Sequence, residues 1–148
     1  MKMILLILLS VTLLCACKEK PTSNTHWGTP EHIATEFFHA LYNDKDLEKA
    51  KSLSTDEFAA LLDSYVTPRQ VGRTLMNMSY DTVTIEVNRS GQNLRQQYDE
   101  NADITLVFSG ERDGKKMDNL RTVSLVKKSG KWLVTEVKVD PFSSTATY

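Results

Sequence analysis

The chain has 148 residues, a formal net charge of −1 and two cysteines, and 25% of its residues are charged. A nearly balanced charge, without a cluster of lysine and arginine, gives no support for nucleic-acid binding. About 120 residues follow position 29, which is enough for one hydrophobic core and too few for two domains.

The amino terminus begins with Met1 and Lys2, followed by an apolar run from Met3 to Leu14. A positive residue before such a run is typical of a secretion signal. The run is shorter than the roughly 20 apolar residues that a helix needs to cross a bilayer. We therefore expect a signal peptide at residues 1–16, and a single uncleaved membrane anchor is the alternative.

Both cysteines lie at the end of this run, in the segment Leu14-Cys15-Ala16-Cys17. The segment resembles the lipobox of bacterial lipoproteins, in which a long apolar residue stands three positions before an obligatory cysteine and a small residue directly before it. Leu14 and Ala16 match the positions that the signal peptidase recognises, whereas Cys15 departs from the usual middle residue. The resemblance implies a diacylglycerol on Cys17, and two or three acyl chains anchor a protein durably to a membrane.

The lipobox also predicts where the protein resides. Cys15 leaves with the signal and Cys17 carries lipid, so no thiol remains for a nucleophile, a disulfide or a thiolate metal site. In enteric-type bacteria, Lys18 in place of Asp implies the outer membrane, on its periplasmic face. Residues 17–29 are predicted to form the lipidated cysteine and a polar tether, long enough to hold the domain roughly 20 Å from the bilayer. We expect a lipid-anchored protein of the bacterial cell envelope.

Residues 30–148 are predicted to form one domain whose first half is helical. Thr29 can cap a helix that has Pro30 at its first position. Asp46, Thr55 and Thr67 are predicted to begin three further helices. The side chains expected to point inward are Ile33, Ala34, Phe37, Phe38 and Leu41, then Leu47, Ala50 and Leu53, then Phe58, Leu61, Leu62 and Tyr65, and finally Val71, Leu75 and Met78.

After Ser79 the apolar period changes to two, which predicts strands with one buried face. Val83, Ile85 and Val87 alternate with polar residues, and so do Ile104, Leu106 and Phe108. Asp113-Gly114 and Ser129-Gly130 are typical of hairpin turns, so two more strands are expected near 117–128 and 131–139. The segment 88–101 is predicted to be either a long loop or a protruding hairpin that extends the neighbouring strands.

This order indicates an α+β domain, with N-terminal helices packed on a curved antiparallel sheet of about four strands. The segments "TPEHIATEFFHALYNDKDLEKAKSL", Ala102-x-Ile104-x-Leu106 and "LVKKSGKWLVTEVKV" resemble the nuclear-transport-factor-two-like, or SnoaL-like, cone. The likeness is strongest to small envelope lipoproteins that carry a domain of unknown function. A cystatin-like sheet around one helix is the alternative. That superfamily holds isomerases, dehydratases and cyclases as well as members without chemistry, so the fold does not decide the activity.

One group of residues in the first helix has the types that bind metals. His32, Glu36 and His39 are spaced i, i+4, i+7, but this face lies opposite the apolar stripe and should be exposed to solvent. The two histidines stand about 10 Å apart along the helix axis, which is too far for one coordination shell of roughly 2 Å bonds. We therefore predict no metal site.

The strands supply no obvious acid and base. Glu86 and Asp103 lie opposite the buried alternation and are predicted to be surface residues rather than a catalytic pair. The best candidates for polar and aromatic groups at the mouth of the cone are Tyr42, Tyr65, Arg121 and Trp132. No catalytic residue and no cofactor are predicted.

These observations favour a membrane-anchored lipoprotein whose domain is a non-catalytic binding module for an envelope protein, a cell-wall component or a small apolar ligand. The alternative is a cone-pocket enzyme of the isomerase or hydrolase type that acts on a small apolar molecule. A filled cone would favour the first, and a deep pocket with an inward titratable group would favour the second. The resemblance also implies a homodimer formed through the outer face of the sheet.

Overall fold

The computed structural model describes residues 28–88 and 95–139. The predicted signal peptide and the lipobox residues Leu14, Ala16 and Cys17 therefore lie outside the described residues. Within these two ranges, no helix is long and apolar enough to cross a membrane.

The first helix, α1 (Pro30–His39), begins where the sequence predicts. The hydroxyl of Thr29 accepts a hydrogen bond from the backbone N–H of His32 at 3.3 Å, and Pro30 occupies the first turn, where its missing N–H costs nothing. The helix continues into a π-helical turn, η1 (Ala40–Asp44), which ends at Lys45 with a φ of 55°. The predicted stripe of Ala34, Phe37, Phe38 and Leu41 is buried, and Ile33 is partly buried.

Three shorter helical segments follow. α2 (Leu47–Ser52) and α3 (Asp56–Asp63) are capped by Asp46 and Thr55, as predicted. The fourth predicted helix is a single α-helical turn, α4 (Pro68–Gln70), followed by a second π-helical turn, η2 (Val71–Leu75).

The prediction that Leu61 points inward is wrong, because its side chain is 41% exposed. The buried face of α3 runs through Phe58 and Leu62. Leu61 lies about 100° around the helix from Leu62 and falls at the edge of that face.

The strands form one antiparallel sheet. They are β1 (Thr82–Val87), β2 (Arg95–Tyr98), β3 (Asn101–Arg112), β4 (Lys115–Lys128) and β5 (Lys131–Val139). The order is β1-β3-β4-β5, and β2 pairs with the start of β3 on the edge that β1 also uses. The part of segment 88–101 that is described thus extends the sheet as a hairpin, which was one of the two alternatives; residues 89–94 lie outside the described residues. The predicted α+β architecture is confirmed.

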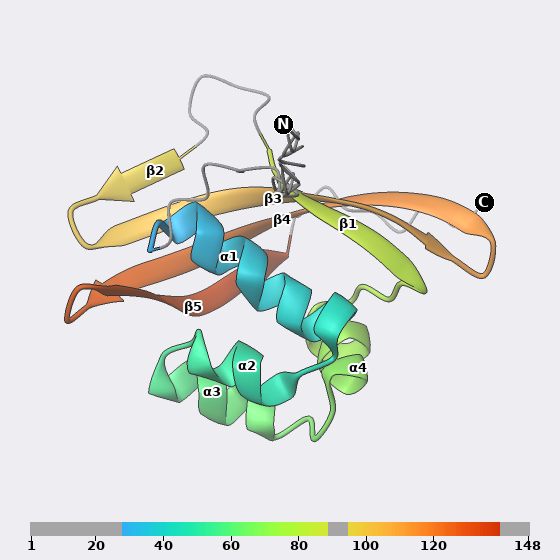
Figure 1. Cartoon of the computed structure of the whole chain (residues 1–148), viewed down its shortest axis with the longest axis horizontal. Coiled ribbons are helices and arrows are strands. Elements are labelled where there is room, and N and C mark those ends of the chain that lie inside the picture. Colours follow the sequence, from blue (N-terminus) through green and yellow to red (C-terminus); the bar gives the residue numbers. More distant parts are fainter. Residues whose placement is uncertain (1–27, 89–94, 140–148) are drawn as a thin grey trace, which may run out of the picture.

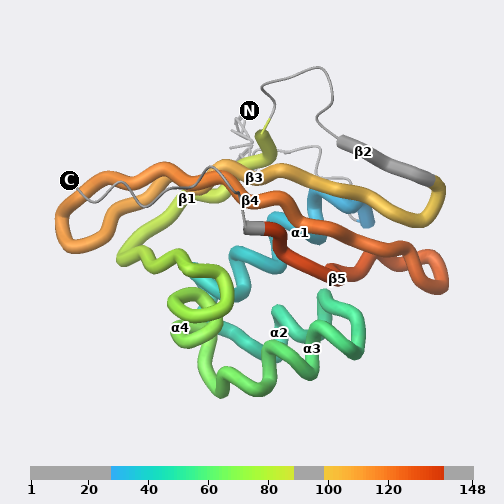
Figure 2. Tube along the Cα trace, turned by 180° about the vertical axis from the view of Figure 1, so that it is seen from behind, coloured from blue at the N-terminus to red at the C-terminus, as the bar shows by residue number. Residues whose placement is uncertain are grey.

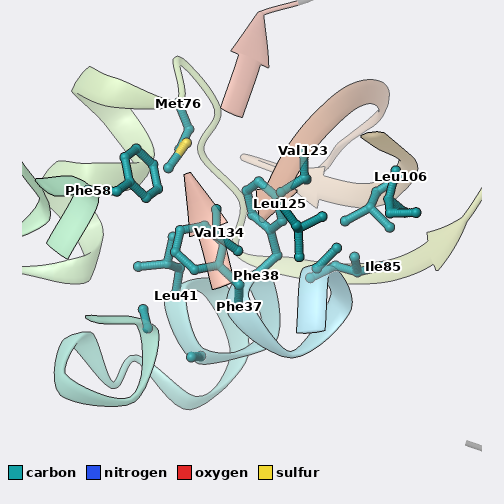
Figure 3. Close-up of a cluster of buried hydrophobic side chains, with 14 of the residues drawn as sticks. Phe37, Phe38, Leu41, Phe58, Met76, Ile85, Leu106, Val123, Leu125 and Val134 are labelled. Carbon is teal, nitrogen blue, oxygen red and sulfur yellow. The ribbon is translucent and has the colours of Figure 1, made fainter. Parts of the chain in front are cut away.

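The core lies between α1 and the sheet. α1 runs across one face of the sheet, with α2 and α3 beside it and α4 near its C-terminal end (Figure 1). Seen from behind, the strands lie in front of α1 (Figure 2). The buried apolar side chains of both layers meet there (Figure 3), and they include Phe37, Phe38, Ile104, Leu106, Phe108, Val123, Leu125 and Val134.

Aromatic rings fill the space beneath α1. The ring of Phe38 meets that of Phe37 edge to face at 5.1 Å, and it meets that of Phe108 in the same way at 4.8 Å. These three side chains have no exposed surface. The interior beneath α1 is therefore a packed core.

Candidate functional site

A hollow of about 500 Å³ opens beside the C-terminal end of α1. Its wall comes from three segments that are distant in the sequence: the end of η1, the turn formed by α4 and η2, and the residues that lead into β1 (Figure 1). A smaller hollow of about 310 Å³ shares Tyr42, Lys45, Tyr80 and Asp81 with it. Ligand pockets typically enclose roughly 300–1,000 Å³, so the larger hollow can hold a small molecule.

Both π-helical turns contribute to this wall, η1 through Tyr42 and η2 through Gly72. A Cβ atom on Gly72 would lie 3.0 Å from Cε1 of Tyr42 and 3.2 Å from the carbonyl oxygen of Met78. Glycine at this position therefore lets the Tyr42 ring lie against η2. Single π-helical turns occur frequently at functional sites.

Two tyrosine rings stand on the wall. Tyr42 and Tyr80 meet edge to face, with ring centroids 5.4 Å apart. The Tyr42 hydroxyl donates to the carbonyl oxygen of Met78 at 3.2 Å. The Tyr80 hydroxyl accepts a hydrogen bond from Nδ2 of Asn119 at 2.8 Å and lies 3.5 Å from Sδ of Met78. Both hydroxyls are thus held by the protein.

Burial raises the pKa of the Tyr42 phenol, and the neighbouring Tyr80 raises it further. Burial also raises the pKa of the Tyr80 phenol, although the hydrogen bond from Asn119 opposes this. Both groups therefore stay protonated at neutral pH, since an ordinary tyrosine already has a pKa of about 10. They act as neutral polar groups there and not as bases.

A buried cation lies behind the wall. Arg121, on the inner face of β4, is only 2% exposed. Its Nη1 donates to the carbonyl oxygen of Leu120 at 2.7 Å and its Nη2 to that of Met76 at 3.3 Å, whereas its Nε has no hydrogen-bond partner. Its positive charge opposes the rise in the pKa of both Tyr42 and Tyr80.

Two further cations lie at the surface of the hollow. Lys45 and Arg69 line it and are exposed, and neither forms a salt bridge within the described part of the chain. The carboxylate on the wall belongs to Asp81, and its Oδ2 accepts a hydrogen bond from the backbone N–H of Asp113 at 2.8 Å. The charged groups of the wall are therefore two cations and one carboxylate that the β3–β4 turn holds.

The four candidates from the sequence lie in different places. Tyr42 lines the hollow, and Arg121 lies behind its wall. Tyr65 is partly buried against the core. Trp132 is buried on β5 near the β4–β5 turn, with Nζ of Lys127 5.9 Å from its ring centroid. The structure brings Tyr42 and Arg121 near one another and leaves the other two outside the wall.

Sequence reasoning missed Tyr80, Lys45 and Arg69. Each lies in an irregular segment or a single helical turn, where no hydrophobic period indicates which way a side chain points. The capping pair Thr67-Pro68 was a usable signal, because it places Arg69 in the first turn of a helix. Nothing in the sequence relates that turn to Lys45 or Tyr80.

The histidine-containing face of α1 is half-buried, which differs from the solvent-exposed face that we expected. The reason is that α2 packs beside α1, and Nζ of Lys49 lies 3.0 Å from Oε2 of Glu36. His39 is hydrogen-bonded to Asn43 at 2.8 Å. Residues 28–88 and 95–139 contain no group of three or more ligating side chains that could hold a metal ion.

The two strand carboxylates lie on the outer face of the sheet. Glu86 is exposed. Asp103 is half-buried and accepts hydrogen bonds from Oγ of Ser124 at 2.6 Å and Nζ of Lys138 at 2.8 Å. Burial acts to raise the pKa of Asp103, but these hydrogen bonds outweigh it and hold the pKa below its ordinary value.

Comparisons with known proteins concern the fold. No family model matches the sequence, and no curated protein matches it either. A SEC-C motif-containing protein from Rhodopseudomonas palustris is similar in structure, with a TM-score of 0.57 and 17% identity over 76% of this chain and 80% of that one. An NTF2-like protein of unknown function from Shewanella oneidensis aligns with a TM-score of 0.45 and 13% identity over 71% of this chain and 90% of that one. At such identities, the likeness extends to the fold alone.

Proposed function

We propose that this protein is a lipid-anchored component of the bacterial cell envelope whose α+β domain binds a partner or ligand without transforming it. The observation that carries the non-catalytic part is the packed interior beneath α1, where aromatic side chains occupy the space in which a cone enzyme would hold its substrate. The phenols beside the hollow are protonated, and the carboxylate of Asp81 is bonded to Asp113. The phenols are therefore not set up as general bases near pH 7.

The anchor rests on the lipobox, and labelling with radioactive palmitate in a bacterial host tests it. We expect the full chain to take up label and to sediment with membranes. Cys17→Ser should lose both properties, whereas the matched control Cys15→Ser should keep both. Label that persists in Cys17→Ser would contradict the assignment of Cys17.

The choice of membrane can be tested separately in an enteric host. Because Asp after the lipidated cysteine commonly retains a lipoprotein at the inner membrane, Lys18→Asp should move the protein from the outer to the inner membrane fraction on a density gradient. An unchanged distribution would argue against sorting by Lys18.

One observation favours the alternative of a cone-pocket enzyme. Arg121 is a buried cation with a free Nε, and it lies near two phenols; fixed donors of this kind can stabilise a developing negative charge. Hydrolysis of p-nitrophenyl acetate and isomerisation of a small β,γ-unsaturated ketone would expose such an activity. We expect no rate above that of the buffer. An acceleration that Tyr42→Phe or Arg121→Met abolishes would support the enzyme.

A further inference from the structure

We propose that the hollow beside Tyr42 and Tyr80 binds a small organic acid, with its anionic group at Lys45 and Arg69 and a flat apolar part against the two rings. This inference rests on the proposed binding function and names the ligand class for it. It replaces the purely apolar ligand that the sequence suggested with an amphipathic anion.

The charges of the wall support an anion. Lys45 and Arg69 come from two segments that are distant in the sequence, Lys45 directly after η1 and Arg69 from α4, and both line the hollow. Neither is engaged in a salt bridge within the described residues. A carboxylate or phosphate placed between them would receive charge-assisted hydrogen bonds, which are roughly twice as strong as neutral ones.

The buried guanidinium of Arg121 adds to this field from behind. Its charge is felt at the phenols of Tyr42 and Tyr80, since it lowers the pKa of both. Both tyrosines line the hollow, although the carboxylate of Asp118 raises the pKa of Tyr80 and so opposes the effect of Arg121 there. No salt bridge within the described residues neutralises Arg121, and a charge in a medium of low dielectric acts over a longer distance than one in water.

Asp81 is the group on the wall that opposes an anion. Its Oδ2 is bonded to the N–H of Asp113, in the turn between β3 and β4. This hydrogen bond holds the carboxylate toward the hairpin and offsets part of its charge. The charged residues that line the hollow are Lys45, Arg69 and Asp81, so the formal charge of the lining is positive by one unit.

The tyrosine rings account for the apolar part of the ligand. The hydroxyls of Tyr42 and Tyr80 are already hydrogen-bonded to Met78 and Asn119. A ligand would therefore contact mainly the ring surfaces of the two tyrosines. The rings also continue the aromatic cluster of the core, because Tyr42 stacks on Phe38 at 6.1 Å and Tyr80 on Phe108 at 6.4 Å. Rings that are fixed in this way can bind a flat group with little loss of side-chain entropy.

Three small probes test this assignment on the purified full chain in detergent micelles. Phenylacetate has both the ring and the anion, phenylacetamide keeps the ring without the charge, and acetate keeps the charge without the ring. We expect calorimetry to show one phenylacetate site. Its affinity should exceed that of either other probe by at least about tenfold, because phenylacetamide loses the charge-assisted hydrogen bonds and acetate loses the contact with the rings.

A pair of double variants tests the location. Lys45→Gln/Arg69→Gln should weaken phenylacetate binding by at least about tenfold. The control Lys128→Gln/Lys131→Gln removes two exposed lysines at the β4–β5 turn, at the opposite end of the strands. That control should leave the affinity within about twofold of the wild-type value, apart from general screening.

The outcomes separate this inference from the proposed function. Equal affinity for phenylacetate and phenylacetamide would overturn the claim that the ligand is an anion but would keep the hollow as a binding site. A loss of affinity in the control pair equal to that in the test pair would overturn the location. No saturable binding of any probe would overturn the inference as a whole, whereas the palmitate experiment on Cys17 would still decide the anchor independently.

Discussion

The packed centre beneath α1 and the rim beyond its C-terminal end differ in their surroundings, although one run of aromatic rings connects them. Beneath the helix, Phe37, Phe38 and Phe108 are fully buried and their rings pack edge to face. At its C-terminal end the rings carry hydroxyl groups, and the chain opens into a hollow of about 500 Å³. One core is thus packed in its centre and bordered by a hollow at its rim.

The change coincides with the two π-helical turns. η1 and η2 replace regular helix where the hollow begins. A π turn adds a residue to the helical turn and rotates the side chains that follow it. Tyr42 lies within η1 and Lys45 directly follows it, and both residues line the hollow.

The largest effect is expected from the closed centre. Phe38→Ala should lower the free energy of unfolding by about 3–5 kcal/mol, because it removes a ring that packs on Phe37 and Phe108 and leaves a cavity. Urea denaturation followed by circular dichroism measures this. Leu61→Ala is the control, since Leu61 is partly exposed and should cost below about 0.5 kcal/mol. Equal losses in the two variants would mean that the centre is not a packed core.

The contribution of the rim to stability should be measurable at alkaline pH, through the phenol of Tyr42. The pKa of the Tyr42 phenol is raised in the folded chain, so the native state keeps a proton that the unfolded chain loses above about pH 10. Stability should therefore fall as the pH rises beyond that value, by up to about 1.4 kcal/mol per pH unit for this group.

Tyr42→Phe removes this titration. Its free energy of unfolding, measured in urea from pH 7 to pH 11, should depend less steeply on pH than that of the wild type. At pH 7 the variant should lose about 1 kcal/mol, because the carbonyl of Met78 loses its donor. Parallel pH profiles for the two proteins would contradict a buried phenol at the rim.

Arg121 lies between the two regions and offers a sharper test. A guanidinium with an unpartnered Nε is costly to bury, and an apolar side chain of similar size often fits such a place as well or better. We expect Arg121→Met to raise the free energy of unfolding by about 1 kcal/mol and to raise the pKa of Tyr42 and Tyr80 further. A loss of more than about 3 kcal/mol would show that the hydrogen bond to Met76 is essential.

The smallest effect on the free energy of unfolding is expected on the outer face of the sheet, which belongs neither to the packed centre nor to the rim. Asp103→Asn should cost below about 1 kcal/mol at pH 7, because the ion pair with Lys138 is partly exposed. The pKa of Asp103 is lowered in the fold, so its contribution is present above the ordinary value of 3.8 and is lost as the pH falls through the lowered pKa. Acid titration of both proteins should show their stabilities converging as the pH falls through the lowered pKa of Asp103.

Most of the fold could be predicted from the sequence because its signals are local. Thr29, Thr55 and Thr67 each precede a helix and cap it, and the alternation around Ile104 and Leu106 places β3 with the correct face inward. Leu61 was predicted wrongly because the width of a buried helix face depends on neighbours that the sequence does not show.

The site could be predicted only in part. Tyr42 was one of the four candidates for polar or aromatic groups at the mouth of the cone, but the π-helical turns leave no pattern of side chains to recognise. Lys45, Arg69 and Tyr80 meet only because three irregular segments converge. Arg121 shares the inward period of Val123 and Leu125, so its burial was readable from β4 once the register was known.

The most direct test of the central claim is a crystal structure of the full chain grown with phenylacetate. We expect density for the ligand at the rim, with its ring against Tyr42 and Tyr80 and its carboxylate near Lys45 and Arg69, and an unchanged core beneath α1. Ligand density between Phe37 and Phe108, in an interior that has opened to receive it, would overturn binding at the rim and favour the cone-pocket enzyme.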